Sequence, residues 1–423
     1  MENAIAQQTS GTSRLSRFFS SFGPGIMMAA AAVGGSHLVA STKAGAIYGW
    51  QLVLLILLVN LFKYPFFRAG VQYTMATGNS LVRGYAGMGK AYLWLFAVLC
   101  IFSAVINTAA LVLFSASLLS YFVPFELSMI TLSVIVVVTC LVILFAGHYK
   151  ALDVLAKAIM IVLTITTLLA VVIAFGKGGA TPVVVETASP WTIGAIGFLV
   201  VTMGWMPAPI EISSITSVWL KSQCSQQKVT PRSALFDFNV GYVGTAILAV
   251  MFLALGALVL HGTGVTLAGS GIGFTHQLVG LYASTIGEWS RYLIAVIAFF
   301  CIFGSTITVL DGYSRVVAES LALLQKKSEY SEASYSIWVL LTSVLALAII
   351  AFWASALLPM LDFAMIMAFM TTPFFALLNH MLVGRTRLSG ELAVSSGLKW
   401  LSIAGLVYLF GFLLVFIWWK WLM

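Results

Sequence analysis

The chain has 423 residues, of which 61% are hydrophobic and only 8% are charged. A soluble domain carries about 25% charged residues, so this composition excludes an ordinary water-soluble fold and indicates a polytopic membrane protein. The formal net charge of +8 does not indicate nucleic-acid binding, because lysine and arginine residues mark the cytoplasmic side of a membrane protein.

Apolar stretches of about twenty residues, the length that spans a bilayer, recur along the whole chain. We therefore expect an all-α polytopic membrane protein with eleven membrane-spanning helices and no soluble domain. Residues 1–21 are expected to form a cytoplasmic tail without a cleaved signal peptide. The expected spans are 22–48, 49–74, 91–122, 127–147, 151–176, 191–220, 238–260, 287–325, 335–357, 359–384 and 399–421.

The distribution of positive charge predicts a cytoplasmic N-terminus and a C-terminus on the outside. The connections on the cytoplasmic side hold Arg14, Arg17, Arg83, Lys90, Lys150, Lys221, Lys228, Arg232, Lys326, Lys327, Arg385 and Arg387. The opposite side holds only Lys43, Lys177, Arg291 and Lys420. We expect an integral protein of the bacterial inner (plasma) membrane, with the lipid bilayer as its surroundings.

Two of the expected spans contain residues that interrupt a helix. The first span holds the stretch Val33 to His37, and the sixth holds Met203 to Ser217 with Pro207 and Pro209 inside it. Each proline removes a backbone donor, and backbone freed at membrane depth persists only where protein or a wet cavity covers it. Breaks five spans apart predict a five-plus-five inverted repeat with a substrate site between the breaks. The repeats would be 22–176 and 191–384, with 399–421 as an additional span.

This layout resembles the Nramp family of divalent-metal transporters, which share the LeuT-type fold. The resemblance covers nearly the whole chain and implies broken first and sixth helices, secondary active transport of a divalent metal ion, and no enzymatic activity. The motifs that carry it are Gly23-Pro24-Gly25, Ala44 to Trp50, Ala76 to Leu81, Gly147 to Leu152, and Met206-Pro207.

The chain departs from the family pattern at the residues that would bind metal. The family's Asp-Pro-Gly-Asn at the first break aligns with residues 34–37, so Gly34 stands in place of the aspartate and His37 in place of the asparagine. The histidine position of the sixth helix is Ala208, and the third span carries no acid. The resemblance therefore implies the fold and the transporter class, while metal binding and proton coupling need support from other residues.

The candidate substrate site comprises residues of both breaks. A carboxylate inside a membrane span costs roughly 2.5 kcal/mol or more to insert and marks a functional site, and imidazole and thioether ligands favour zinc, copper, nickel or iron over magnesium. His37, Met206 and Glu211 are therefore the candidate metal ligands. The alternatives are a hydrogen-bonded core histidine, a core methionine and a structural carboxylate that pairs with a cation. The whole candidate set is Gly34, Gly35, Ser36, His37, Met206, Pro207, Ala208 and Glu211.

Charged residues outside the breaks are candidates for coupling or for lining a vestibule. Lys43 near the outer end of the first span would repel a divalent ion and attract an anion or zwitterion. Asp311 and Arg315 are spaced i, i+4 on one helix face and are expected to form an ion pair. Further polar residues at membrane depth are Lys63, Asn107, Glu319 and Asp362.

Three functions remain open at this point. The first is divalent-metal transport. The second is transport of a small organic solute such as an amino acid, whose carboxylate would bind the free backbone of Gly34 to Ser36. The third is a membrane sensor that does not transport. No nucleotide-binding loop or HExxH motif is present, which argues against an enzyme or an ATP-driven pump. We expect a monomer that needs no cofactor, with a proton or sodium as coupling ion.

Overall fold

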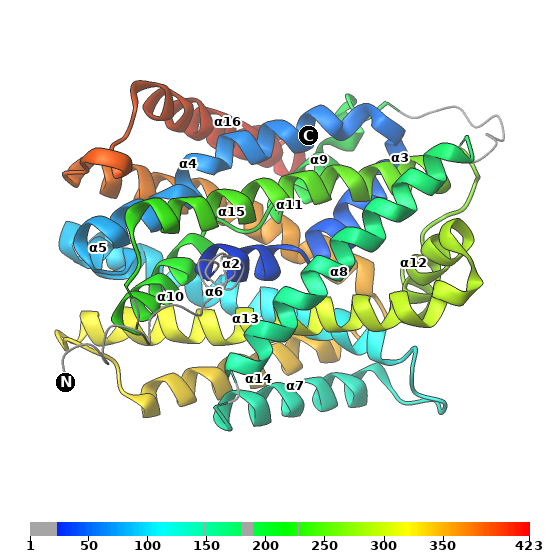
Figure 1. Cartoon of the computed structure of the whole chain (residues 1–423), viewed down its shortest axis with the longest axis horizontal. Coiled ribbons are helices and arrows are strands. Elements are labelled where there is room, and N and C mark those ends of the chain that lie inside the picture. The colour runs from blue at the N-terminus through cyan, green and yellow to red at the C-terminus, as the bar shows by residue number, and fades with distance from the viewer. Residues whose placement is uncertain (1–22, 148, 179–188, 227) are drawn as a thin grey trace, which may run out of the picture.

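The computed structural model describes residues 23–147, 149–178, 189–226 and 228–423, and every regular element in them is a helix (Figure 1). Up to residue 178 the elements are α2 (Pro24–Ala32), the π-helical turn η2 (Ser36–Ser41), α3 (Thr42–Tyr48), η3 (Gly49–Leu52), α4 (Val53–Thr77), α5 (Leu81–Met88), α6 (Lys90–Leu119), α7 (Met129–Phe145) and α8 (Tyr149–Gly176). After residue 188 they are η4 (Ile193–Ala195), α9 (Ile196–Gly204), α10 (Ile212–Gln226), α11 (Pro231–Val259), α12 (Gly271–Ile286), η5 (Glu288–Ser290), α13 (Arg291–Leu324), α14 (Glu332–Trp353), α15 (Leu357–Arg385), η6 (Gly390–Leu392) and α16 (Ser396–Trp421).

The helices have the length and composition of membrane spans. Seven helical stretches of the described residues are long and apolar enough to cross a bilayer, and three shorter apolar helices lie at Met129–Phe145, Met160–Gly176 and Ile193–Gly204. Large apolar side chains such as Leu57, Val138 and Phe352 are exposed on the outside of the bundle, where they suit lipid. Each expected span coincides with helix, and the prediction of an all-α membrane fold is confirmed.

Two short helices were not expected from the sequence. α5 follows α4 and α12 precedes α13, and they lie at opposite ends of the bundle (Figure 1). Each begins with a serine cap: Ser80 Oγ accepts a hydrogen bond from the Arg83 amide, and Ser270 Oγ accepts one from the Gly273 amide. Both helices are shorter than the length that spans a bilayer.

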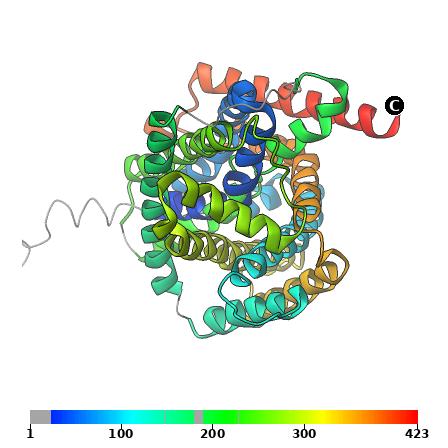
Figure 2. The same ribbon diagram turned by 90° about the vertical axis from the view of Figure 1, so that its right-hand side faces the viewer.

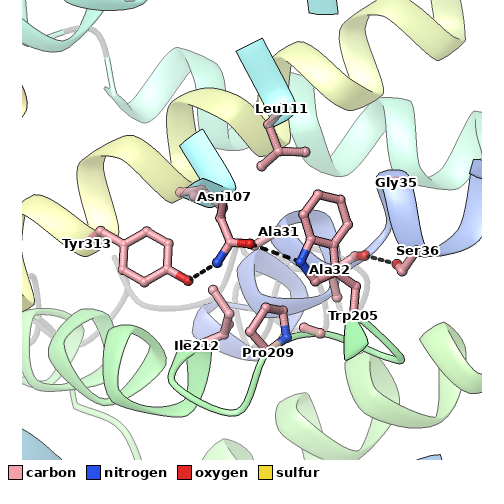
Figure 3. Close-up of a pocket in the computed structure, with 12 residues that line it drawn as sticks. Ala31, Ala32, Gly35, Ser36, Asn107, Leu111, Trp205, Pro209, Ile212 and Tyr313 are labelled. Carbon is pink, nitrogen blue, oxygen red and sulfur yellow. Dashed lines mark hydrogen bonds between the residues drawn. The ribbon is translucent and has the colours of Figure 1, made fainter. Parts of the chain in front are cut away.

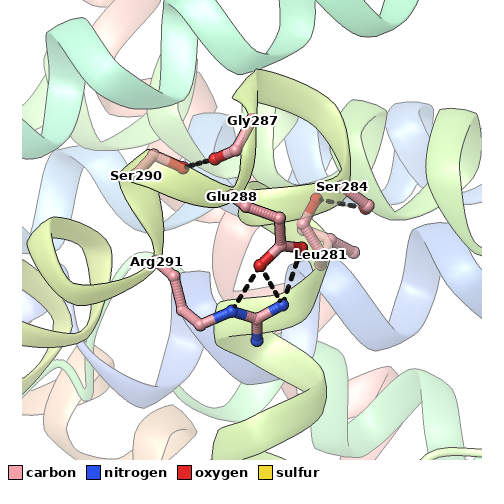
Figure 4. Close-up of polar contacts among 6 residues, drawn as sticks. All are labelled: Leu281, Ser284, Gly287, Glu288, Ser290 and Arg291. Carbon is pink, nitrogen blue, oxygen red and sulfur yellow. Dashed lines mark hydrogen bonds and ion pairs between the residues drawn. The ribbon is translucent and has the colours of Figure 1, made fainter.

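An exposed ion pair lies at the corner between α12 and α13 (Figure 4). The Arg291 Nε and Nη2 atoms each lie 2.8 Å from a carboxylate oxygen of Glu288. Ser290 Oγ donates to the Gly287 carbonyl oxygen at 2.8 Å and tightens the same turn. Because the pair is exposed to solvent, it orders the corner but contributes little to stability.

The half-helix α2 lies in the middle of the bundle. It packs against α10, α11 and α13, whereas α16 and α7 lie at opposite edges (Figures 1 and 2). Glycines allow the central helices to approach closely, because a Cβ atom at Gly45 would lie 2.0 Å from the Leu253 carbonyl oxygen. α3 and α11 therefore touch through their backbones, and the second half of the first broken helix is held against α11.

Candidate functional site

The first break separates α2 from η2 at residues 33–35. A Cβ atom at Gly35 would lie 2.5 Å from Cζ3 of Trp205, so glycine allows the indole ring to lie directly against this backbone. Gly34 lies against the Ser305 side chain of α13. The adjacent glycines thus bring the first break into contact both with the sixth break and with α13.

Side chains satisfy the carbonyl groups around the first break. Ser305 Oγ donates to the Ala30 carbonyl oxygen at 2.8 Å, and Cys301 Sγ donates to the Val33 carbonyl oxygen at 3.0 Å. Ser36 Oγ lies 2.7 Å from the Ala32 carbonyl oxygen. Buried backbone groups need such partners, so α13 stabilises the interruption of α2.

The second break separates α9, which ends at Gly204, from α10, which begins at Ile212. Pro207 and Pro209 lie between them, and the peptide bond before Pro207 is cis. Neither proline has an amide hydrogen, so this segment cannot continue the hydrogen-bond ladder of α9. The helix therefore stops within the bundle and exposes its last carbonyl groups to the interior.

Lys63 of α4 fills the space at the end of α9. Its side chain is fully buried, and its Nζ atom donates to the carbonyl oxygens of Met203 at 2.8 Å, Gly204 at 3.0 Å and Ala208 at 3.4 Å. A cation is favourable there because the C-terminal end of a helix carries partial negative charge. The sequence marked Lys63 as a polar residue at depth but did not connect it with the sixth break.

A small cavity of about 30 Å³ lies between the two breaks (Figure 3). This volume holds about one water molecule. The first break, the sixth break, α6 and α13 all contribute to its wall. The lining residues are Ala31, Ala32, Gly35, Ser36, Asn107, Leu111, Trp205, Ala208, Pro209, Ile212, Val309 and Tyr313, and none of them is acidic or basic.

A directed chain of hydrogen bonds runs along the wall of this cavity (Figure 3). Trp205 Nε1 donates to Asn107 Oδ1 at 2.9 Å, and Asn107 Nδ2 donates to the Tyr313 hydroxyl at 2.8 Å. The Tyr313 hydroxyl in turn donates to Glu211 Oε1 at 3.0 Å. Each donor in this series of hydrogen bonds points toward Glu211. The series therefore connects the cavity to a carboxylate that does not itself line the cavity.

His37 lies beside the cavity with both ring nitrogens engaged. Its Nε2 atom is 2.9 Å from the Thr245 carbonyl oxygen, which can only accept, so Nε2 carries a hydrogen. Its Nδ1 atom is 2.6 Å from Ser36 Oγ. The ring is fully buried and is not among the residues that line the cavity. In this conformation His37 orients the Ser36 hydroxyl and links the first break to α11.

The structure separates the candidate site residues into two groups. Gly35, Ser36 and Ala208 line the cavity. The other candidates do not line it: Gly34, His37, Met206, Pro207 and Glu211. Met206 is fully buried, and Glu211 is buried behind Tyr313. Within the described part of the chain, no three His, Cys, Asp or Glu side chains lie together so that they could hold a metal ion.

The charged candidates outside the breaks are ion-paired. Lys43 Nζ lies 2.8 Å and 2.9 Å from the two carboxylate oxygens of Asp362, so α3 is linked to α15. The expectation that Lys43 presents a net positive charge is therefore wrong, because Asp362 neutralises it. Arg315 Nε lies 2.9 Å from Asp311 Oδ2, which confirms the expected i, i+4 pair. The hydroxyl of Tyr335 adds a hydrogen bond to Asp311 Oδ1 at 2.7 Å.

Trp205 and Tyr313 are the cavity residues with polar side chains that the sequence analysis did not single out. Aromatic residues are common throughout this chain, and nothing in the local pattern distinguishes these two. Asn107 and Lys63 carried a usable signal, because polar side chains at membrane depth are costly and usually have a partner or a function. Their partners lie 98 or more positions away in the sequence, and only the fold brings them together.

Comparisons with known proteins place these features in a wider context. The family described as Natural resistance-associated macrophage protein-like (Nramp) matches residues 25–419. An uncharacterised protein of Pasteurella multocida is 52% identical over 402 residues, which cover 94% of this chain and 92% of that protein.

Solved structures show the same fold at low sequence identity. The Eremococcus coleocola manganese transporter, solved with an aromatic bis-isothiourea compound, has a TM-score of 0.70 and 14% identity, covering 96% of this chain and 88% of its own. MhsT in complex with L-phenylalanine has a TM-score of 0.63 and 13% identity over 96% of this chain and 98% of its own. A nucleobase-cation-symport-1 family transporter with bound bromovinylhydantoin has a TM-score of 0.60 and 13% identity, covering 94% and 92%.

Proposed function

The chain belongs to the Nramp family, and from this premise we propose that it is a secondary active transporter that carries a divalent metal ion by alternating access. Members of this family are membrane transporters and not enzymes. The proposed substrate site is the cavity between the breaks of the first and sixth helices. The solved manganese transporter of Eremococcus coleocola, which shares the fold, supports a metal ion as the substrate.

The size and lining of the central cavity carry this proposal. Its volume of about 30 Å³ suits a single ion or water molecule and is far smaller than the hundreds of Å³ typical of small-molecule sites. Its polar side chains are Ser36, Asn107, Trp205 and Tyr313, and three of these carry hydroxyl or amide oxygens that can serve as ligand atoms. Oxygen ligands of this kind suit manganese or magnesium.

We assign different roles to the residues of the two breaks. Ser36 contacts the ion, Ala208 forms part of the cavity wall beside it, and Gly34 and Gly35 allow the interruption of the first helix. His37 holds the Ser36 hydroxyl, while Met206 and Pro207 shape the sixth break beside it. These assignments follow two distances: Ser36 Oγ lies 2.6 Å from His37 Nδ1 and 3.4 Å from the Pro207 carbonyl oxygen.

Glu211 contributes negative charge near the proposed ion. It acts through Tyr313, whose hydroxyl donates its hydrogen to Glu211 Oε1 and therefore turns its oxygen lone pairs away from the carboxylate. A tyrosine that donates to a carboxylate is a stronger acceptor, because hydrogen-bond chains polarise one another. The carboxylate thus favours a cation in the cavity without binding it directly.

We place the protein in the bacterial inner membrane as a monomer, with the N-terminus in the cytoplasm and the C-terminus outside. The positive charges on one side of the expected topology support this orientation. The Lys43–Asp362 pair then lies in the outer half of the first span and near the outer end of α15, and the Asp311–Arg315 pair lies on α13 toward the cytoplasm. A proton or sodium is the proposed coupling ion.

Uptake into proteoliposomes tests the proposed function. The purified chain is reconstituted, and uptake of manganese, iron, zinc and magnesium is compared with uptake by protein-free liposomes. We expect uptake of manganese or magnesium that saturates with ion concentration. Absence of both transport and calorimetric binding for all four ions would overturn the proposal.

The second candidate function is transport of a small organic solute. The observation that favours it is the absence of any acidic side chain among the residues that line the cavity. A cavity able to hold an amino acid would require the two breaks to separate in another conformation. A thermal-shift screen across amino acids decides between the candidates: a stabilising amino acid without metal uptake favours the organic solute. If Glu211→Gln leaves every assay unchanged, a sensor that does not transport becomes the better interpretation.

A further inference from the structure

The end of α9 is built like a site for a small cation. Lys63 Nζ lies 2.8 Å, 3.0 Å and 3.4 Å from the carbonyl oxygens of Met203, Gly204 and Ala208. Two of these residues form the last turn of α9, and Ala208 belongs to the segment between the two prolines. The end of a helix and an unwound segment of backbone together supply the oxygen cage, which is how broken membrane helices bind monovalent cations.

The number of acceptors matches the three hydrogens of an ammonium group. An ammonium group has three hydrogens to donate, and three carbonyl oxygens are arranged around it. A neutral amine would have only two hydrogens for the three acceptors. The side chain is fully buried, so water does not replace any of these contacts.

The local charges agree with a resident cation. Glu211 and Lys63 are both at most 1% exposed, and the two opposite charges interact through the protein interior although no direct ion pair joins them. A buried charge without a partner is strongly destabilising, whereas opposite charges in the same region compensate each other. The last carbonyl groups of α9 add the partial negative charge of a helix terminus.

We propose that the oxygen cage at the end of α9 is a monovalent-cation site that the chain fills itself with the ammonium group of Lys63. The tethered ammonium takes the position of a dissociable ion, so the sixth break keeps its shape without sodium or potassium. Removal of the side chain beyond Cβ opens the cage to a free alkylammonium ion. This inference goes beyond the proposed transport function and does not depend on the identity of the substrate.

Chemical rescue of Lys63→Ala tests the inference. The alanine variant lacks the atoms of n-propylammonium, so this ion restores the missing group. Thermal unfolding of the purified full chain in detergent is measured in n-propylammonium, choline or sodium chloride at equal ionic strength, and with n-propanol as a neutral analogue. We expect Lys63→Ala to melt below the unsubstituted protein, and n-propylammonium to raise its Tm by ~2 °C or more in a saturable manner.

The controls separate the cage from general effects of amines. The unsubstituted protein and Lys399→Ala, which removes an exposed lysine of α16, are expected to show no response to n-propylammonium beyond that to choline. Lys63→Met keeps most of the side-chain volume and removes the charge, so it is expected to melt below the unsubstituted protein and not to respond to the amine. An equal response to n-propanol, or a response of the same size in Lys399→Ala, would overturn the inference.

The methionine variant decides the matter if Lys63→Ala does not fold. The yield of monodisperse protein is then measured by fluorescence-detected size-exclusion chromatography of fusions extracted from membranes. A clear loss of yield or Tm in Lys63→Met supports the resident cation, and values equal to those of the unsubstituted protein refute it. Neither readout uses transport, so a failure of the proposed metal transport would leave this result unaffected.

Discussion

The Tyr313 hydroxyl donates to Oε1 of Glu211 at 3.0 Å, although the two residues are 102 positions apart in the sequence. Tyr313 belongs to α13 and lines the central cavity, whereas Glu211 lies behind it at the end of the sixth break. The relationship places the carboxylate one side chain away from the cavity. It connects the charge at the centre of the bundle to the position proposed for the ion.

Replacement of Tyr313 by phenylalanine removes this connection while the ring remains. We expect Tyr313→Phe to lower stability by ~1–3 kcal/mol, because Asn107 Nδ2 and Glu211 Oε1 each lose a buried partner. Metal uptake in proteoliposomes is expected to fall by about tenfold, which corresponds to ~1.4 kcal/mol in the free energy of binding or of the transport barrier. Tyr292→Phe, on an exposed tyrosine of the same helix, is the matched control and is expected to behave as the unsubstituted protein.

Glu211→Gln leaves the buried Lys63 without its nearby negative charge. We expect a loss of roughly 1–3 kcal/mol of stability in thermal or denaturant unfolding, because the buried hydrogen bond from Tyr313 loses its charged acceptor. The double variant Glu211→Gln with Lys63→Met is expected to be more stable than the sum of the single effects by ~0.5–3 kcal/mol. Glu332→Gln, at the exposed start of α14, is the control. Strictly additive effects would show that the two charges do not interact.

Gly35→Val would fill the contact between the two breaks. A Cβ atom there lies 2.5 Å from the Trp205 ring, so the ring must move and the cavity changes shape. We expect loss of most metal uptake and a stability cost of ~1–3 kcal/mol from overpacking. Gly244→Ala in α11, where an added Cβ meets nothing within 4 Å, is the control and is expected to retain uptake. Normal uptake by Gly35→Val would place the ion path elsewhere.

The Lys43–Asp362 pair links the first and tenth spans. Its side chains are 9% and 34% exposed, so we expect a coupling energy of ~0.5–1 kcal/mol from the double-mutant cycle of Lys43→Ala and Asp362→Ala. Both single variants are expected to alter the initial rate of uptake, because they free α3 from α15. The same cycle on Glu288 and Arg291 serves as the control. That pair is more exposed and lies within one turn, so its coupling is expected to be near zero.

The membrane fold followed from composition and from apolar stretches of spanning length. The two breaks were also predicted, because Gly34-Gly35 and Pro207 with Pro209 interrupt helices by local chemistry alone. The helices α5 and α12 were missed because they are too short to register as spans. Their serine caps at Ser80 and Ser270 were the signals that could have revealed them.

The partners of buried polar groups were decided only by the tertiary structure. The sequence determined that Lys63, Glu211 and Lys43 carry charges in an apolar chain, because residue type and span length are local properties. It did not determine that Lys63 binds the end of α9 or that Asp362 neutralises Lys43, because those pairs join residues 140 and 319 positions apart. Burial makes an unpaired charge costly, but the sequence contains many groups that could serve as its partner. Only the packing of the helices selects one of them.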